Sequence, residues 1–204
     1  NTSGSGVGTV AGLSVTDDGA SNTSEFTLSD ASQALSEGLS ISSEIDIATI
    51  SSTVSTVNGA VVIDSPVLFL SGNINSGAAS QPYSGAVTLA DDVTLATSTG
   101  VAGDLEIRFK GTVESQNSGE GPGPYSLTLE SEAIYAEGDI GGLRPLESFS
   151  AYSVNDTAER GQFYSSVHTD GLQSYKAGSS SGDVEFNGTY TAGGGIELLG
   201  EGTF

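Results

Sequence analysis

The residues that could carry out chemistry are few and widely spaced. His168 is the only histidine, and Asp170 follows it two positions later. A serine–histidine–aspartate triad could use these two side chains, but we find no nucleophile elbow of the strand-to-helix kind, since the chain shows almost no helical pattern. Asp170-Gly171 is more typical of a hairpin or corner turn. We therefore expect no catalytic residue and no enzymatic activity.

Two acidic pairs are the best candidates for a metal site. Asp17-Asp18 precedes a glycine and Asp91-Asp92 separates two apolar stretches, and both positions are typical of turns. The chain has no cysteine and one histidine, so a metal would depend on carboxylate oxygens, which suit calcium. Neither an EF-hand loop nor a Gly-Gly-x-Gly-x-Asp repeat is present. We expect no dedicated cofactor, with weakly bound calcium at these aspartates as the open alternative.

The strongly acidic composition excludes several classes of partner. The 204 residues include 26 acids and 5 bases, for a net charge of −21. The bases are Arg108, Lys110, Arg144, Arg160 and Lys176. Binding of phosphate groups needs clustered basic side chains, so nucleic acid is not an expected partner. No apolar run approaches the ~20 residues that span a bilayer, so we expect no membrane insertion.

Short β-strands must position these residues. Apolar side chains recur at every second position along most of the chain, which predicts strands with one buried face. A more specific pattern, apolar-x-apolar-x-Gly-x-apolar, occurs four times, at Leu68–Ile74, Ile107–Val113, Ile134–Ile140 and Val184–Tyr190. We expect each glycine to mark a corner where an inward side chain would be crowded. Ile196 and Leu198 before Gly200 form a looser fifth copy.

The repeats predict an all-β solenoid, a parallel β-helix. Residues 69–85 resemble residues 162–178, with Tyr83 matching Tyr175, and residues 103–115 resemble residues 182–192. Strand starts near 26, 45, 68, 87, 107, 127, 149, 167 and 184 suggest a coil of about 20 residues. A β-sandwich or jelly roll is the alternative, because its turns would show similar spacing.

Residues 68–195 also resemble a known family. The stretch SGAVTLADDVTLATSTG followed by GDLEIRFKGTVES, with Tyr83 before it and GDVEFNGTYTAGGG later, is similar to repeats of filamentous-haemagglutinin-like adhesins. YSLTLES followed by GDIGGLRPLESFSAYS resembles a second unit of that family. The resemblance implies a right-handed parallel β-helix, export to the cell surface as a secreted protein, and adhesion or fibre formation. For an extracellular protein, Asn1, Asn22, Asn155 and Asn187 are candidate glycosylation sites.

We expect one β-solenoid domain over residues 1–204. Residues 1–25 are a candidate flexible or exchanged segment, residues 26–65 are atypical or capping coils, and residues 68–195 are the degenerate repeats. An uncovered solenoid end offers unpaired strand edges, so the first hypothesis is a filament subunit that stacks head to tail into a homopolymer. Its assembly residues would be Val7, Val10, Leu13, Val15, Ile196, Leu198 and Phe204. The alternative is an adhesin or carbohydrate-binding module that binds a glycan or cell-surface ligand through Tyr83, Tyr135, Tyr152, Tyr164, Tyr175 and Tyr190.

Overall fold

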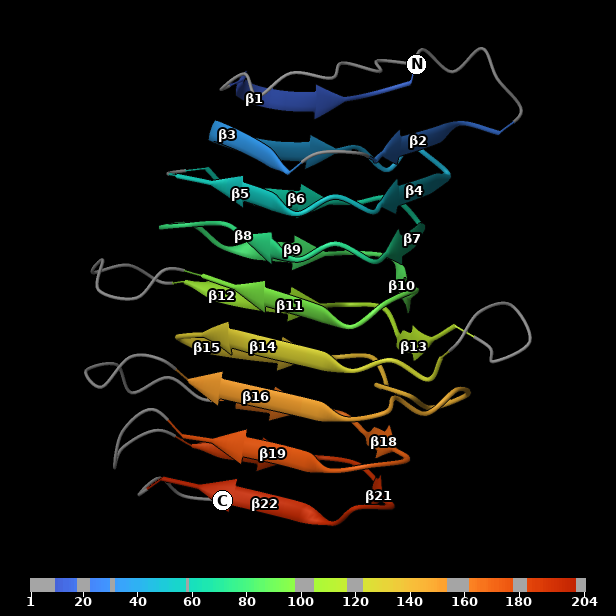
Figure 1. The fold of residues 1–204 in the computed structure, drawn as a ribbon, viewed down its shortest axis with the longest axis vertical. Coiled ribbons are helices and arrows are strands. Elements are labelled where there is room, and N and C mark those ends of the chain that lie inside the picture. The colour runs from blue at the N-terminus through green and yellow to red at the C-terminus, as the bar shows by residue number, and fades with distance from the viewer. Residues whose placement is uncertain are drawn as a thin grey trace.

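The computed structural model is a β-solenoid of about seven turns. It describes residues 10–17, 23–29, 32–57, 59–97, 105–116, 123–153, 162–177 and 183–200. These residues form strands, turns and bends without a helix, and every paired strand runs parallel to its neighbours. The predicted parallel solenoid is therefore confirmed. The β-sandwich alternative is wrong, because the sandwich needs antiparallel pairing and the strands here stack as coils (Figure 1).

Each coil contributes strands to three faces of the solenoid. Face 1 contains β2 (Glu25–Leu28), β4 (Ile47–Ile50), β7 (Val67–Leu70), β10 (Ala86–Leu89), β13 (Val113–Ser115), β18 (Val167–Thr169) and β21 (Tyr190–Ala192). Bridges from Val113 to Ile140 and from Ile140 to Val167 connect β13 with β18 across the coil between them. Face 1 is therefore a continuous column from β2 to β21.

Faces 2 and 3 share one long strand. β3 (Gln33–Ile41) begins on face 2, pairing with β5, and ends on face 3, pairing with β6. Face 2 continues with β5 (Val54–Thr56), β8 (Ile74–Asn75), β11 (Val93–Ala96), β14 (Leu127–Ser131), β16 (Phe149–Ser153), β19 (Gln173–Lys176) and β22 (Ile196–Leu199). Face 3 continues with β6 (Val61–Ile63), β9 (Gln81–Tyr83), β12 (Glu106–Phe109), β15 (Ala133–Ala136), β17 (Gln162–Tyr164) and β20 (Val184–Phe186). β1 (Val10–Val15) covers β3 at the N-terminal end (Figure 1).

The coil length is less regular than the sequence suggested. Ile47 pairs with Val67 and Val67 with Ala86, so these early coils are 20 and 19 residues long. Val87 pairs with Val113 and Leu95 with Leu129, which gives spacings of 26 and 34 residues. The strand starts expected near 87, 107 and 127 lie on faces 1, 3 and 2, so they do not mark successive coils. Additional residues between strands lengthen the later coils, and the coil between β13 and β18 crosses face 1 with an isolated bridge at Ile140 in place of a strand.

The glycine motif marks corners, but for a different reason from the one expected. A Cβ atom on Gly138 would lie 2.4 Å from the carbonyl oxygen of Gly111, and a Cβ atom on Gly111 would lie 2.4 Å from that of Gly85. The crowding therefore comes from the backbone of the neighbouring coil along the solenoid axis, and the core is not its source. Three copies of the motif lie at the corner from face 3 to face 1. The copy with Gly72 lies at the corner from face 1 to face 2.

Only part of the proposed duplication superposes in the structure. Ile107 and Val184 occupy matching positions on face 3, and the equivalence extends through the following glycine corner. Tyr83 lies on face 3 and Tyr175 on face 2, so that part of the alignment is wrong. Residues 26–65 form coils with the same three faces as the rest. None of the described residues belongs to a helix long and apolar enough to cross a membrane.

A narrow apolar core fills the interior between the three faces. Inward positions alternate with outward ones along each strand, as in β7, where Leu68 and Leu70 are buried. Like residues stack along the axis, and the rings of Tyr83 and Phe109 lie parallel, 5.1 Å apart. Near the C-terminal end Phe149, Tyr164 and Tyr175 form an aromatic cluster. Among the fully buried side chains, those of the first coils are aliphatic and aromatic rings occur from Tyr83 onward.

Candidate functional site

The acidic pair Asp91-Asp92 lies at a corner and shapes the backbone there. The Oδ1 atom of Asp91 accepts a hydrogen bond from the backbone N–H of Asp92 at 2.8 Å. The Oδ1 atom of Asp92 accepts one from the N–H of Ser126 in the next coil, also at 2.8 Å. One coil earlier, Asn73 accepts from Thr94 in the same way, at 2.7 Å. These side chains therefore connect successive coils at the corner from face 1 to face 2.

The candidate metal ligands do not come together in the described part of the chain. Asp17 and Asp91 belong to coils at different heights of the solenoid, and Asp18 lies outside the described residues. No three histidine, cysteine, aspartate or glutamate side chains in residues 10–17, 23–29, 32–57, 59–97, 105–116, 123–153, 162–177 and 183–200 are grouped as metal ligands. His168 lies on β18, and Asp170-Gly171 forms the corner to β19, with N–H groups that bond to Leu146 and Glu147 of the preceding coil.

Three of the candidate ligand-binding tyrosines are core residues. Tyr83, Tyr164 and Tyr175 are each at most 1% exposed. Each hydroxyl donates to the Oε1 atom of the glutamine two positions earlier, at distances of 2.8 to 3.0 Å. The strand period of two explains the pairing, because residues i and i+2 face the same side. The sequence analysis missed this Gln-x-Tyr motif, although its three copies at 81–83, 162–164 and 173–175 are visible in the sequence.

The glutamine of each motif also connects two coils. Gln173 on β19 donates from Nε2 to the carbonyl oxygen of Val167 at 3.0 Å and to that of Thr191, in the next coil, at 2.8 Å. Gln81 reaches Ala96 and Gln162 reaches Lys176 in the same manner, at 2.6 and 2.8 Å. Gln173 therefore satisfies the buried Tyr175 hydroxyl and two backbone carbonyls with one side chain.

Burial determines the ionisation of these tyrosines. Desolvation raises the pKa of Tyr83, Tyr164 and Tyr175 well above the ordinary value of 10.0. At Tyr190, burial raises the pKa to about 12, and a hydrogen bond with the backbone of Asn187 opposes the increase. The folded chain thus holds these hydroxyl groups protonated in a pH range in which an unfolded chain releases their protons.

We expect the protein to unfold cooperatively in alkali. Above pH ~10 the unfolded state binds fewer protons than the folded state, so stability falls by up to about 1.4 kcal/mol per pH unit for each buried tyrosine. Circular dichroism and tyrosinate absorbance should therefore change together as the pH rises. Tyr164→Phe should reduce the pH slope by about one proton. Ionisation of all seven tyrosines with an unchanged β signal would contradict the expectation.

The outer surface carries one organised cluster of charges and aromatic rings. Arg108 on β12 bonds to Glu106 at 3.0 Å and to Glu137 at 2.8 Å. Its guanidinium carbon lies 4.4 Å from the centre of the Tyr135 ring on the next coil. Hydrogen bonding to Glu106 raises the pKa of Arg108 further above its usual range. Tyr135 and Tyr152 are the candidate ligand-binding tyrosines that face outward from their strands.

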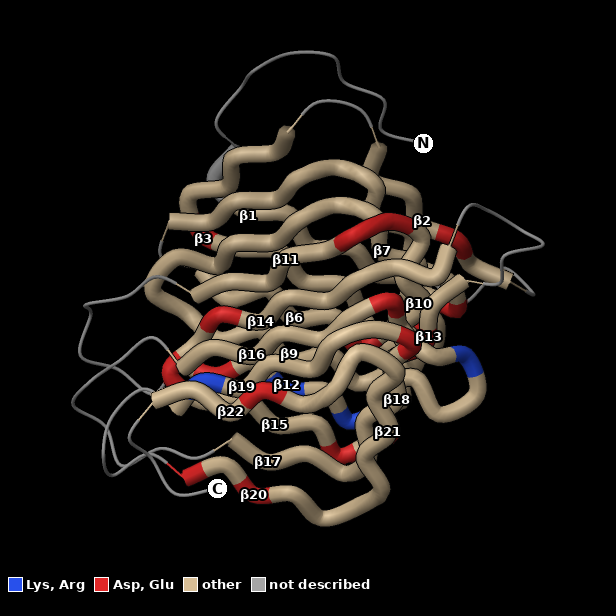
Figure 2. The backbone as a smooth tube through the Cα atoms, turned by 60° about the horizontal axis from the view of Figure 1, so that its bottom comes forward, with Lys and Arg blue, Asp and Glu red and all other residues tan. Residues whose placement is uncertain are grey.

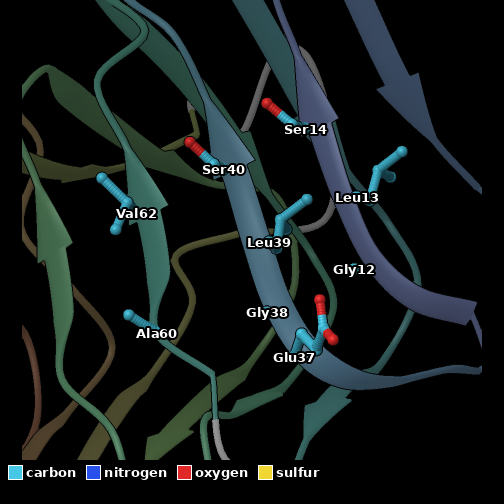
Figure 3. A pocket seen from close by; sticks show the side chains of 9 residues that line it. All are labelled: Gly12, Leu13, Ser14, Glu37, Gly38, Leu39, Ser40, Ala60 and Val62. Atoms are coloured by element: carbon cyan, nitrogen blue, oxygen red, sulfur yellow. The ribbon is translucent and has the colours of Figure 1, made fainter.

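A shallow groove lies on face 3 near the N-terminal end (Figure 3). Small residues of β1, β3 and the start of β6 line it, among them Gly12, Ser14, Ser40 and Ala60. Glu37 is the one charged side chain of this lining. Basic residues lie around β12 and β19 and beside β13, while acids are spread more widely (Figure 2). The groove therefore offers no grouping of charges for a particular ligand.

The two ends of the solenoid differ from its middle. At the C-terminal end, Ile196 and Leu198 continue inward-facing columns yet are 48% and 47% exposed. Six apolar side chains pack against the core while staying only partly buried, and all belong to end coils: Leu13, Val15, Phe26, Leu28, Phe186 and Tyr190. Within the described residues, β1, β2, β20, β21 and β22 each pair along one edge. Among the described residues, no strand covers the apolar core beyond these end strands.

Five of the predicted assembly residues lie on the terminal strands β1 and β22. Leu13 and Val15 lie on β1, the first described strand, and Ile196 and Leu198 lie on β22, the last one. Val10 also belongs to β1. Val7 and Phe204, like the sequons at Asn1, Asn22 and Asn155, lie outside the described residues, whereas Asn187 is exposed after β20. Phe26, Phe186 and Tyr190 were not among the predicted assembly residues. Whether such a side chain lies at an end of the solenoid depends on which coils are the first and the last, which the local sequence pattern does not indicate.

Comparisons of the chain with protein-family models, with curated proteins and with solved structures find no match.

Proposed function

We propose that the chain is a subunit of an extracellular structural filament, built by head-to-tail stacking of solenoids. The observation that carries the proposal is the apolar end of the described core on each side, where side chains in columns that are buried in the inner coils stay partly exposed. An unpaired strand edge is a template for another strand. Another copy of the chain has the same three-faced cross-section and parallel strand direction, so it would extend each ladder.

Electrostatics set the conditions under which such stacking is expected. A net charge of −21 opposes association, and residues 1–106 contain no base. Self-repulsion of this kind weakens as salt shortens the Debye length to about 10 Å at 0.1 M and to 3 Å at 1 M. Filaments should therefore form more readily with added salt or divalent cations. The proposed location outside the cell rests on the resemblance to surface adhesins.

Substitution of Leu198 by aspartate should prevent assembly. The change places a charge in the apolar end of the core, so we expect polymer, measured by sedimentation and electron microscopy, to fall roughly tenfold or more, as for a loss of about 1.4 kcal/mol. Leu143→Asp is the matched control, because Leu143 is 88% exposed on the side of the solenoid. It adds the same charge without touching an end, and should leave assembly unchanged.

Two outcomes would count against the filament. Dispersed monomers of the unmodified chain at high concentration, in salt and in calcium, would overturn it. Equal loss of polymer in Leu198→Asp and Leu143→Asp would show that charge, and not the end surface, controls association. Monomers that bind immobilised glycans would favour the adhesin alternative, for which the outward-facing Tyr135 beside Arg108 is the supporting observation.

A further inference from the structure

We propose that two copies share one composite coil, in which β21 and β22 of one copy supply faces 1 and 2 and β1 of the next copy supplies face 3. This inference rests on the proposed filament and specifies its register. The last described strands are β21 on face 1 and β22 on face 2, while the first, β1, ends on face 3 against the second half of β3. The two ends are therefore complementary parts of one coil.

On each face, inward side chains at matching positions of successive coils form a column along the solenoid axis. The inward column of face 3 determines the first contact between two copies. Val15 pairs with Ile41, and the column passes through each coil to Tyr164 and then Phe186. Val15 and Phe186 are its two ends, and both are only partly buried. Placing Phe186 of one copy beside Val15 of the next continues the column with its usual strand spacing of ~4.8 Å.

The inward column of face 1 fixes the second contact independently. It starts at Phe26 beside Ala48 and finishes with Val167 beside Tyr190. Phe26 and Tyr190 are again partly buried. The composite coil places Tyr190 of one copy beside Phe26 of the next. One rigid stacking of the two copies thus continues the inward columns of face 3 and face 1 at the same time.

The outward side chains are compatible with this register. Glu185 precedes Phe186, so it would lie beside Ser14, and Glu25 of the next copy would lie beside Thr189. Neither carboxylate faces another carboxylate, which matters in so acidic a chain. A slip by one residue would place Glu185 on the core side, because successive residues face opposite sides. In this register, Gly200 of one copy and Val10 of the next would both occupy the position beside Leu35 of that next copy. One of the two chains must therefore turn away from the solenoid at this corner.

Disulfide cross-linking tests the register, because the chain has no cysteine of its own. The double variants Ser14→Cys/Glu185→Cys and Thr27→Cys/Thr191→Cys place thiols on outward positions that the register makes neighbours on faces 3 and 1. Each pair lies at opposite ends of one chain (Figure 1), so a disulfide must join two copies. Under oxidation both variants should give ladders of dimers, trimers and longer species on non-reducing gels.

The matched control is Ser14→Cys/Asn187→Cys, which moves one thiol two positions along the chain, to the exposed residue that follows β20. It should cross-link roughly tenfold less, because diagonal neighbours lie ~7–8 Å apart and disulfides form within about 7 Å between Cα atoms. Filaments with equal or stronger cross-linking of the control would overturn the register and leave the filament standing. Absence of polymer from the unmodified chain would overturn both.

Discussion

Replacement of Gly111 by alanine is expected to destabilise the middle of the solenoid by about 3 kcal/mol, at the upper end of the cost of overpacking. The new Cβ atom would lie 2.4 Å from the carbonyl oxygen of Gly85 and 2.6 Å from its carbonyl carbon. Both are backbone atoms, which cannot rotate away as a side chain would. Relief requires the two coils to separate, which weakens the parallel pairing of β10 with β13.

Gly12→Ala is the control for this substitution. Its Cβ atom would meet the nearest atoms, on Glu37 and Gly38, at 3.4 Å, which is ordinary contact. Urea denaturation followed by circular dichroism should separate the two variants, and hydrogen exchange should accelerate most in β10 and β13 of Gly111→Ala. A Gly111→Ala protein as stable as Gly12→Ala would show that the coils move apart at little cost, contrary to the corner geometry.

Replacement of Gln173 by alanine should have an equal or larger effect, about 3–5 kcal/mol. The side chain is fully buried, so its removal leaves a cavity, and three polar groups lose their partner. These groups are the carbonyls of Val167 and Thr191 and the hydroxyl of Tyr175. An unsatisfied buried polar group costs more than the net gain of the hydrogen bond it made.

A double-mutant cycle separates the hydrogen bond from the cavity. Tyr175→Phe removes the hydroxyl and leaves the Gln173 oxygen without that donor, so we expect a loss of about 1–2 kcal/mol. The double variant should be more stable than the sum of the single losses predicts, by about 1 kcal/mol, because the orphaned partner disappears with it. Additive losses in thermal or urea unfolding would show that the Tyr175–Gln173 bond contributes nothing measurable.

The solenoid could be predicted because two local patterns agree. Period-two apolar residues require strands with an inward side, and glycines after them require sharp corners. The face of each strand could not be predicted in this way, because the same motif occurs at two kinds of corner, as Gly72 and Gly111 show. Residues added between strands change the coil length, while the period-two pattern within each strand stays the same. For this reason strand starts near 87, 107 and 127 gave a false period.

The exposed apolar residues at the ends of the solenoid were harder to predict, because exposure depends on the position of a coil within the stack. Phe186 and Phe109 occupy equivalent positions on face 3, yet Phe109 is buried and Phe186 is partly exposed at the end. Tyrosines were ambiguous for another reason. Tyr164 has an apolar ring and a polar hydroxyl, so it suits both a ligand-binding surface and a core that supplies an acceptor. Gln162, two residues earlier on the same side of the strand, supplies the acceptor for the Tyr164 hydroxyl, and its presence therefore indicates a core position for Tyr164.

The three coil-spanning glutamines have a mechanical consequence. The hydrogen bonds between coils run along the axis of the solenoid, so a pull along this axis loads all three ladders of a coil boundary at once. Gln81, Gln162 and Gln173 each add a side-chain hydrogen bond across one such boundary. Those boundaries should be the last to open under tension. An axially loaded chain would then extend first where these side-chain links are missing, while the linked coils keep their length.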